Sequence, residues 1–119
     1  MLRVLGEELG KFVARGVMRV KDFRGDLAGL DELLKEFFKE VERILPEKYS
    51  TKFEYSSELG KTLITRSKCP VYRIYPKWCE EGCLEFITAF AKTLNDKISV
   101  KRLEKQPESN YCKFEFSIE

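Results

Sequence analysis

Two segments near the amino terminus carry apolar residues at the three- and four-residue spacing of an amphipathic helix. The first runs from Leu2 to about Val17 and contains Gly6 and Gly10, each of which costs roughly 1 kcal/mol against alanine inside a helix. These glycines either let another element approach closely or are simply tolerated, and the pattern leaves both interpretations open. The apolar positions of this helix are Leu2, Leu5, Leu9, Phe12 and Val13.

The second helical segment has clear signals at both ends. Asp26 is a favourable N-cap residue and Pro46 stops a helix, so we expect the helix to lie between them. Its opposite face is charged, and its apolar stripe is too short for a coiled coil, so we expect it to pack on a sheet; a dimer seam is the alternative. Phe38 lies off this stripe and is a candidate for exposure. The stripe consists of Leu27, Leu30, Leu34, Phe37, Val41 and Ile44.

The middle of the chain predicts a β-hairpin followed by a third helix. Alternating and β-branched residues indicate strands at 52–56 and 61–67, joined by a turn at 57–60. A helical apolar pattern then runs over 77–94.

The carboxyl-terminal part predicts a second hairpin. Strands are expected at 98–102 and 112–118, with a turn at 107–110. The resulting order, ααββαββ, favours an α+β fold in which helices cover an antiparallel sheet. No linker or repeat interrupts it, so we expect a single domain over 1–119.

The amino-acid composition argues against several classes of function. Among 119 residues, 22 basic and 20 acidic side chains leave a net charge of +2, which argues against a nucleic-acid partner. The chain has no histidine, which excludes Ser-His-Asp and Cys-His catalysis and every His-containing metal site. No stretch has the roughly 20 apolar residues of a membrane helix, and the first ten residues lack the pattern of a secretory signal. We therefore expect a cytoplasmic protein without a membrane partner.

The cysteines are the main candidates for chemistry. Cys79 and Cys83 are one helical turn apart, Cys112 is on the apolar face of the last predicted strand, and Cys69 ends the first hairpin. We expect several of these thiols to converge where the third helix meets the sheet. Their spacing leaves two interpretations, buried core thiols or metal ligands, and it lacks the C-x2-C knuckles of a zinc ribbon.

The cysteines also carry a resemblance to the 4-vinyl reductase domain, a hydrocarbon-binding domain, over nearly the whole chain. The matching motifs are Cys69-Pro70 at a strand end, Cys79 to Cys83 (CEEGC) at a helix start, Cys112 to Phe114 (CKF) in the last strand, and Leu5 to Gly10 (LGEELG) near the amino end.

This resemblance implies a small-molecule pocket beside a structural zinc ion. Cys112, with Cys79 or Cys83, matches the cysteine ligands of the family, whereas Lys101 and Glu104 stand at the positions of its other two ligands. The zinc site implied here is built from Cys69, Cys79, Cys83 and Cys112, or has Glu104 in place of one thiol.

The leading hypothesis is a non-enzymatic module that binds a small hydrophobic or aromatic molecule. The alternatives are a cysteine-dependent enzyme, either a hydrolase or a tetrapyrrole-processing protein with Cys79 or Cys83 as nucleophile, and an assembly subunit. We also expect a homodimer, with the second helix as its best surface. The pocket hypothesis rests on the many aromatic rings of the chain, those of Phe12 and Phe37 included. The predicted ligand-binding residues are Phe53, Tyr55, Trp78, Phe86, Phe90, Phe114 and Phe116.

Overall fold

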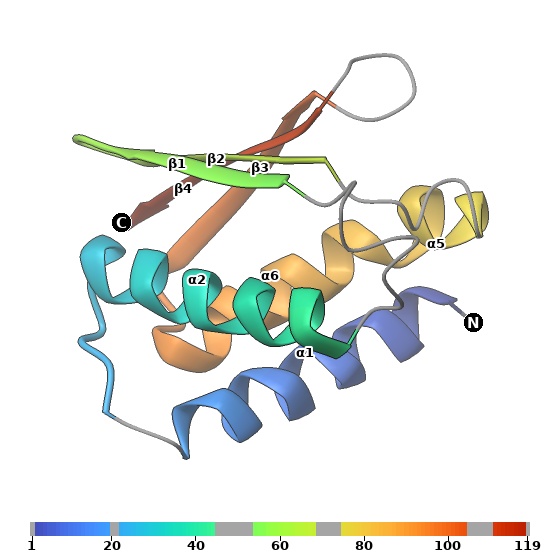
Figure 1. Ribbon diagram of the computed structural model, residues 1–119, viewed down its shortest axis with the longest axis horizontal. Coiled ribbons are helices and arrows are strands. Elements are labelled where there is room, and N and C mark those ends of the chain that lie inside the picture. Colours follow the sequence, from blue (N-terminus) through green and yellow to red (C-terminus); the bar gives the residue numbers. More distant parts are fainter. Residues whose placement is uncertain (1, 20–21, 45–53, 69–74, 105–110, 119) are drawn as a thin grey trace.

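The computed structural model describes residues 2–19, 22–44, 54–68, 75–104 and 111–118. Within these residues the chain forms a four-stranded antiparallel sheet with helices on one side of it (Figure 1). The predicted α+β class and the order of its elements are confirmed. The elements are α1 (Leu2–Met18), α2 (Leu27–Ile44), β1 (Glu54–Leu59), β2 (Leu63–Lys68), α5 (Pro76–Glu81), α6 (Cys83–Leu94), β3 (Ile98–Glu104) and β4 (Cys112–Ile118).

The sheet has the strand order β1-β2-β4-β3, so β2 and β4 are its centre. Alternate residues of these two strands are buried, as the predicted period of two requires. Ile118 departs from this pattern because it is exposed at the end of β4. The buried cross-strand pairs are Leu63 with Phe116, Thr65 with Phe114 and Ser67 with Cys112.

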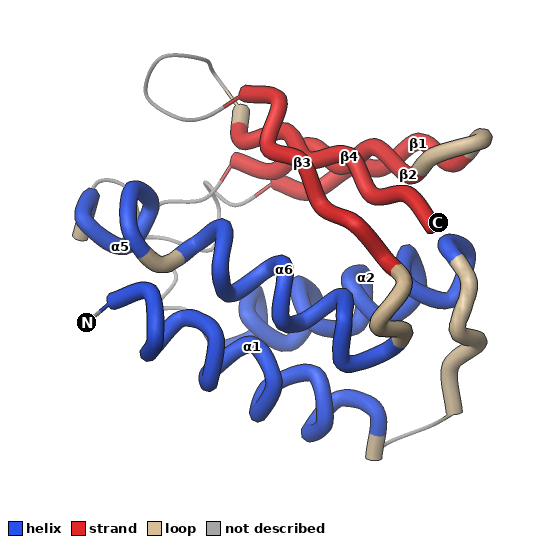
Figure 2. The backbone as a smooth tube through the Cα atoms, turned by 180° about the vertical axis from the view of Figure 1, so that it is seen from behind, coloured by secondary structure: helices blue, strands red, loops and turns tan. Residues whose placement is uncertain are grey.

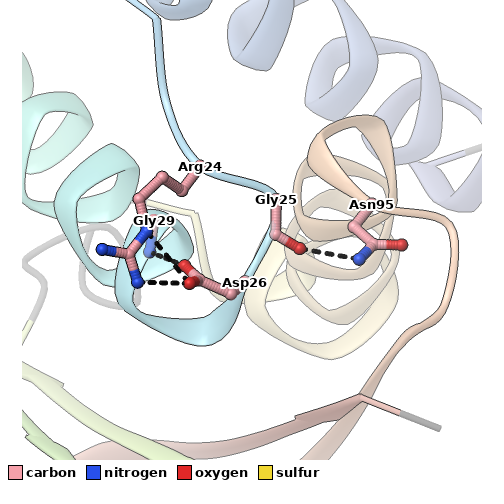
Figure 3. Close-up of polar contacts among 5 residues, drawn as sticks. All are labelled: Arg24, Gly25, Asp26, Gly29 and Asn95. Atoms are coloured by element: carbon pink, nitrogen blue, oxygen red, sulfur yellow. Dashed lines mark hydrogen bonds and ion pairs between the residues drawn. The ribbon is translucent and has the colours of Figure 1, made fainter.

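The start of α2 is fixed by a capped turn (Figure 3). The Asp26 carboxylate accepts a hydrogen bond from the Gly29 N–H at 2.8 Å, which confirms the predicted N-cap, and it also accepts from the Arg24 guanidinium. These two interactions, that of Arg24 first, lower the pKa of Asp26. The Asn95 amide donates to the Gly25 carbonyl at 2.7 Å and so ties this turn to the end of α6.

Helix α2 packs on the sheet, as its stripe predicts. Leu30 and Leu34 are buried, whereas Ile44, at the end of the stripe, is 75% exposed. The expected exposure of Phe38 is wrong, because this side chain is half-buried and its ring stacks on that of Tyr55 with centroids 4.7 Å apart. Most of this stripe is therefore used inside the chain, and a dimer seam on α2 stays a prediction.

Helix α1 lies against α6 on the side away from the sheet (Figures 1 and 2). Its buried residues are Gly6, Gly10 and Ala14. A Cβ atom at Gly6 would lie 2.4 Å from the Gly82 carbonyl oxygen, and one at Gly10 would lie 2.3 Å from the Phe86 carbonyl oxygen. Close approach of two helices, and not mere tolerance, therefore accounts for these two glycines.

Val13, Val17 and Met18 of α1 pack against the core, but other large apolar side chains of this helix lie outside the contact. Leu5 and Leu9 are exposed, and Phe12 is 74% exposed. The expectation that the Phe12 ring contributes to an internal pocket is therefore wrong. Val4 adds a further exposed apolar side chain near the start of the helix.

The predicted third helix, 77–94, is two helices that meet at Gly82. The prediction of one continuous helix is wrong here, because the backbone of Gly82 departs from helical geometry where Trp78 and α1 crowd it. A Cβ atom at Gly82 would lie 2.5 Å from the Trp78 ring and 3.2 Å from the Leu2 carbonyl oxygen. Hydrogen bonding nevertheless passes through the junction, since the Phe86 N–H donates to the Gly82 carbonyl at 2.8 Å.

The first hairpin turns three residues later than predicted. Leu59 pairs with Leu63, and the Gly60 N–H donates to the Thr62 carbonyl at 2.9 Å, which closes a three-residue connection. The sequence Ser57-Glu58 is therefore strand and not turn. The predicted turn at 107–110 and the helix stop at Pro46 lie outside the described residues.

Candidate ligand-binding pocket

A pocket of about 230 Å³ lies between the sheet and the helices α2, α5 and α6. Each of these helices contributes side chains to it, and so do the central strands β2 and β4. Its lining residues are Leu34, Phe37, Phe38, Val41, Thr65, Ser67, Trp78, Cys79, Cys83, Phe86, Ile87, Cys112, Phe114 and Phe116. None of these residues from the described part of the chain is charged.

A larger hollow of about 810 Å³ lies between α1 and α6, but its chemistry is different. Charged side chains of both helices line it, including Lys11, Arg15, Glu85 and Lys92. Such side chains are typical of an open surface groove where solvent reaches them. The smaller pocket is therefore the better candidate for a binding site, since sites for small molecules are mostly apolar with few polar groups.

The sheet supplies both apolar and polar groups to the pocket. Phe114 and Cys112 come from β4, and their cross-strand partners on β2 are Thr65 and Ser67. All four are buried. The two hydroxyls and the thiol place small polar groups in a surface that is otherwise hydrocarbon, so a bound molecule would meet a few donors and acceptors there.

The cysteines converge as predicted, although by a different route. Cys79 belongs to α5 and Cys83 is the first residue of α6, so they do not share one continuous helix, yet both line the same pocket as Cys112. Cys79 and Cys112 are each only 7% exposed. Cys69 lies outside the described residues.

The predicted zinc site finds no support in this geometry. Across the described ranges, no three cysteine, aspartate or glutamate side chains are placed to hold a metal ion together. Glu104 belongs to β3 and does not line the pocket of Cys79 and Cys112. Cys69, one of the four predicted ligands, lies outside the described residues, so the zinc site stays a prediction.

Arg102 holds α5 in place over the pocket. Its Nη1 atom donates a hydrogen bond of 2.8 Å to the Cys79 carbonyl oxygen. Arg102 lies on β3 opposite Phe114 of β4, so this bond joins the sheet to the short helix that carries Trp78 and Cys79. The sequence pattern placed Arg102 in a strand, but nothing in it indicated this contact.

A chain of ring contacts runs from the pocket towards β1. Trp78 meets Phe86 edge-on at 5.9 Å between centroids, and Phe86 lies 5.6 Å from Phe37. Phe37 in turn lies 5.1 Å from Phe38, which stacks on Tyr55. These contacts fix the ring positions along one wall, since ring pairs at such distances attract beyond their burial.

Tyr55 stands at the end of this chain, outside the pocket lining. Its hydroxyl donates to Asp31 Oδ1 at 3.5 Å, and Asp31 also pairs with Lys35. Burial, and next the neighbouring Asp31 charge, raise the pKa of Tyr55 far above its ordinary value. The phenol therefore stays neutral at physiological pH.

The aromatic residues predicted to bind a ligand divide into three groups. Trp78, Phe86, Phe114 and Phe116 line the pocket. Phe90 is fully buried in the core beside the pocket, and Tyr55 stacks on the ring of Phe38, which lines it. Phe53 lies outside the described residues.

The predicted ligand-binding residues include none from α2 or β2, although Phe37 of α2 is among the rings on which the pocket hypothesis rests. Phe37 and Val41 belong to the predicted stripe of α2, and this stripe was expected to face the sheet, so the signal for them was present. Thr65 and Ser67 are small polar residues, and only the strand register shows that they point inward.

Within the described part of the chain, no helix is both long and apolar enough to cross a lipid bilayer. No family model, curated protein or solved structure matches the chain. The resemblance to the 4-vinyl reductase domain therefore stays a prediction that rests on the motifs quoted above.

Proposed function

We propose that this protein binds a small, uncharged and mainly apolar molecule in the pocket between α2, α5, α6 and the sheet. The observation that carries this proposal is the volume of about 230 Å³ together with a lining that has no charged residue among those described. Burying a charge in such surroundings without a partner is very costly, so the pocket selects against ions.

The size of the pocket favours a compact ligand. A cavity of roughly 150 Å³ lined by apolar side chains accommodates benzene. The pocket here is larger, which suits one ring with a substituent or two fused rings. The Phe86 and Phe114 rings offer apolar surfaces to such a molecule, and the Thr65 and Ser67 hydroxyls offer hydrogen bonds to one polar substituent.

Trp78 makes the proposal directly measurable. It is the only tryptophan of the chain, it is half-buried, and it lines the pocket. We expect its fluorescence to change on titration with toluene, indole or naphthalene. At a ligand concentration 100 times the dissociation constant, binding should also stabilise the fold by about 2.7 kcal/mol, which a thermal melt detects.

A pocket-filling variant with a matched control makes the test specific. Cys83→Phe adds a ring to the pocket lining and should abolish the fluorescence and melting responses. Leu59→Phe places the same ring at an exposed position at the end of β1 and should leave both responses unchanged. The proposal fails if no probe produces a response in the wild type, or if the Cys83→Phe protein responds as the wild type does.

The three cysteines at the pocket keep the cysteine-nucleophile hypothesis as a second candidate. A catalytic thiolate is accessible and reacts quickly with an alkylating reagent at neutral pH. Because Cys79 and Cys112 are buried, we expect slow alkylation of both, and slower still with ligand bound. Rapid modification of Cys79 or Cys83, the two predicted nucleophiles, in the folded protein would favour the enzyme hypothesis over simple binding.

A further inference from the structure

The outer face of α1 has the geometry of a helix-pairing seam. Leu5, Leu9, Phe12 and Gly16 follow one another at spacings of four, three and four residues, which places them along one side of the helix. All four are exposed. This side faces away from the contact between α1 and α6, and α1 itself is the helix farthest from the sheet (Figures 1 and 2).

We propose that a second copy of this chain docks on this face, so that two α1 helices pack antiparallel about a two-fold axis. This arrangement is isologous, meaning that each copy offers the same surface to the other. It does not depend on the proposed ligand, and it assigns the association to α1 instead of the α2 stripe that the sequence pattern favoured.

The first argument comes from Gly16. Gly6 and Gly10 are explained by contacts within the chain, but a Cβ atom added to Gly16 would meet no atom within 4 Å. Gly16 lies in the last turn of α1, where glycine is less favourable for a helix than alanine. Close approach of a second molecule on this face supplies a reason for glycine at this position.

The second argument is the register. In an antiparallel pair, the four seam positions match when Leu5 lies opposite Gly16 and Leu9 lies opposite Phe12 of the second copy. At each end of the seam, Leu5 of one copy then faces Gly16 of the other, which has no side chain. A groove of about 330 Å³ lies next to Gly16, between α1 and α2, and is lined by Phe12, Val13, Gly16, Val17, Phe23, Glu36 and Glu40. It gives the Leu5 side chain of the second copy a place to insert.

The third argument is charge complementarity. Glu8 and Arg15 both lie on the same edge of the seam, seven residues apart, and both are exposed. In the antiparallel register, Glu8 of each copy comes close to Arg15 of the other, so the seam gains two opposite-charge contacts. A basic edge without acidic residues would suit an anionic bilayer better, but this edge carries both signs.

Sedimentation velocity over a concentration series tests the proposal with one disruptive variant and one control. We expect the wild type to dimerise and Phe12→Glu to raise the dissociation constant by at least about thirtyfold, the effect typical of a central apolar anchor. Ile44→Glu is the matched control, because Ile44 is 75% exposed and Phe12 is 74% exposed. A wild type that stays monomeric at every concentration overturns the proposal, and so does equal disruption by both variants.

A charge exchange tests the antiparallel register and does not require an apolar residue to be changed. Glu8→Arg alone and Arg15→Glu alone should each weaken the homodimer by about three- to tenfold, because like charges then face each other. An equimolar mixture of these two single variants should dimerise as well as the wild type, since every facing pair is again of opposite sign. Failure of the mixture to recover association overturns this register. Binding of the wild type to phosphatidylserine vesicles with loss of the dimer overturns the proposal as well.

Discussion

Helices α1 and α2 both carry large apolar side chains at helical spacing, but they use them in opposite ways. Helix α2 buries Leu30 and Leu34 against the sheet and leaves most of its charged residues, such as Glu32 and Lys35, exposed. Helix α1 buries Gly6 and Gly10 and leaves Phe12 in contact with solvent. Most of the apolar stripe of α2 is thus on the core side, whereas α1 keeps a row of large apolar side chains exposed beside its core-facing residues.

The difference follows from what each helix packs against. Helix α2 lies on a sheet, where large side chains fill the space between layers. Helix α1 lies on another helix at a distance set by backbone contacts, since a single Cβ atom at Gly10 would already reach the Phe86 carbonyl oxygen. Small residues occupy the contact when two helices come this close, and Leu5, Leu9 and Phe12 of α1 stay exposed beside it.

The largest expected effect comes from truncating a leucine of α2, and the same truncation in α1 is its comparison. Leu33→Ala in α2 should lower the free energy of unfolding by about 2–5 kcal/mol, because Leu33 is completely buried and its loss leaves a cavity. Leu9→Ala in α1 should lower it by less, at most about 1 kcal/mol, because Leu9 is 37% exposed and its loss leaves no closed cavity. Urea unfolding of both variants measures the difference.

This comparison needs a background in which the copies do not associate. Both variants are therefore made with Phe12→Glu, so that the contact proposed for α1 does not contribute to the effect at Leu9. Equal losses at Leu9 and Leu33 would show that the outer face of α1 is part of the core of the single chain, contrary to its exposure.

A smaller effect, of opposite sign at two sites, is expected for glycine substitutions within α1. Gly10→Ala should destabilise the protein by about 1–3 kcal/mol, because the added methyl group overlaps the α6 backbone. The methyl group of Gly16→Ala meets open space. In the Phe12→Glu protein, this substitution should raise the free energy of unfolding by up to about 1 kcal/mol, because alanine favours a helix more than glycine does. Thermal or urea unfolding gives the signs, and stabilisation by both would contradict the close packing of α1 on α6.

The sequence pattern predicted the helices and strands well where the local signals agreed. Asp26 marked the start of α2 because an N-cap acts within one turn, and Cys112 and Phe114 marked the buried face of β4 because alternation is a local property. The break at Gly82 escaped prediction, since it depends on crowding by the Trp78 ring and by α1, and α1 is distant along the chain.

The pocket was predictable only in part, for a related reason. The convergence of Cys79, Cys83 and Cys112 followed from their places on a helix and a strand that were expected to pack together. The roles of Thr65 and Arg102 depend on strand order and register, which bring β2 next to β4 and set Arg102 beside the Cys79 carbonyl. Spacing within one element carries no such information.

The smallest expected effect concerns the junction before α2, where one carboxylate links the turn to the helix. The pKa of Asp26 in the folded chain lies below its ordinary value of 3.8, first because of Arg24 and then because of the Gly29 N–H. The stabilisation that the ionised carboxylate provides is therefore fully present above the unfolded pKa, and it is lost as the pH falls through the folded pKa. Asp26→Asn keeps an N-cap side chain but removes this titration.

Melting temperatures of the wild type and of Asp26→Asn between about pH 6 and about pH 2.5 measure the contribution. The wild type should melt higher near pH 6, and the gap should close at the acid end. Arg24→Gln removes the first cause of the lowered pKa, so its gap to the Asp26→Asn, Arg24→Gln double variant should be smaller at pH 6. A gap that stays constant over the whole range would mean that the carboxylate charge does not stabilise the start of α2, and that its anchoring depends on the Asn95 contact with the Gly25 carbonyl.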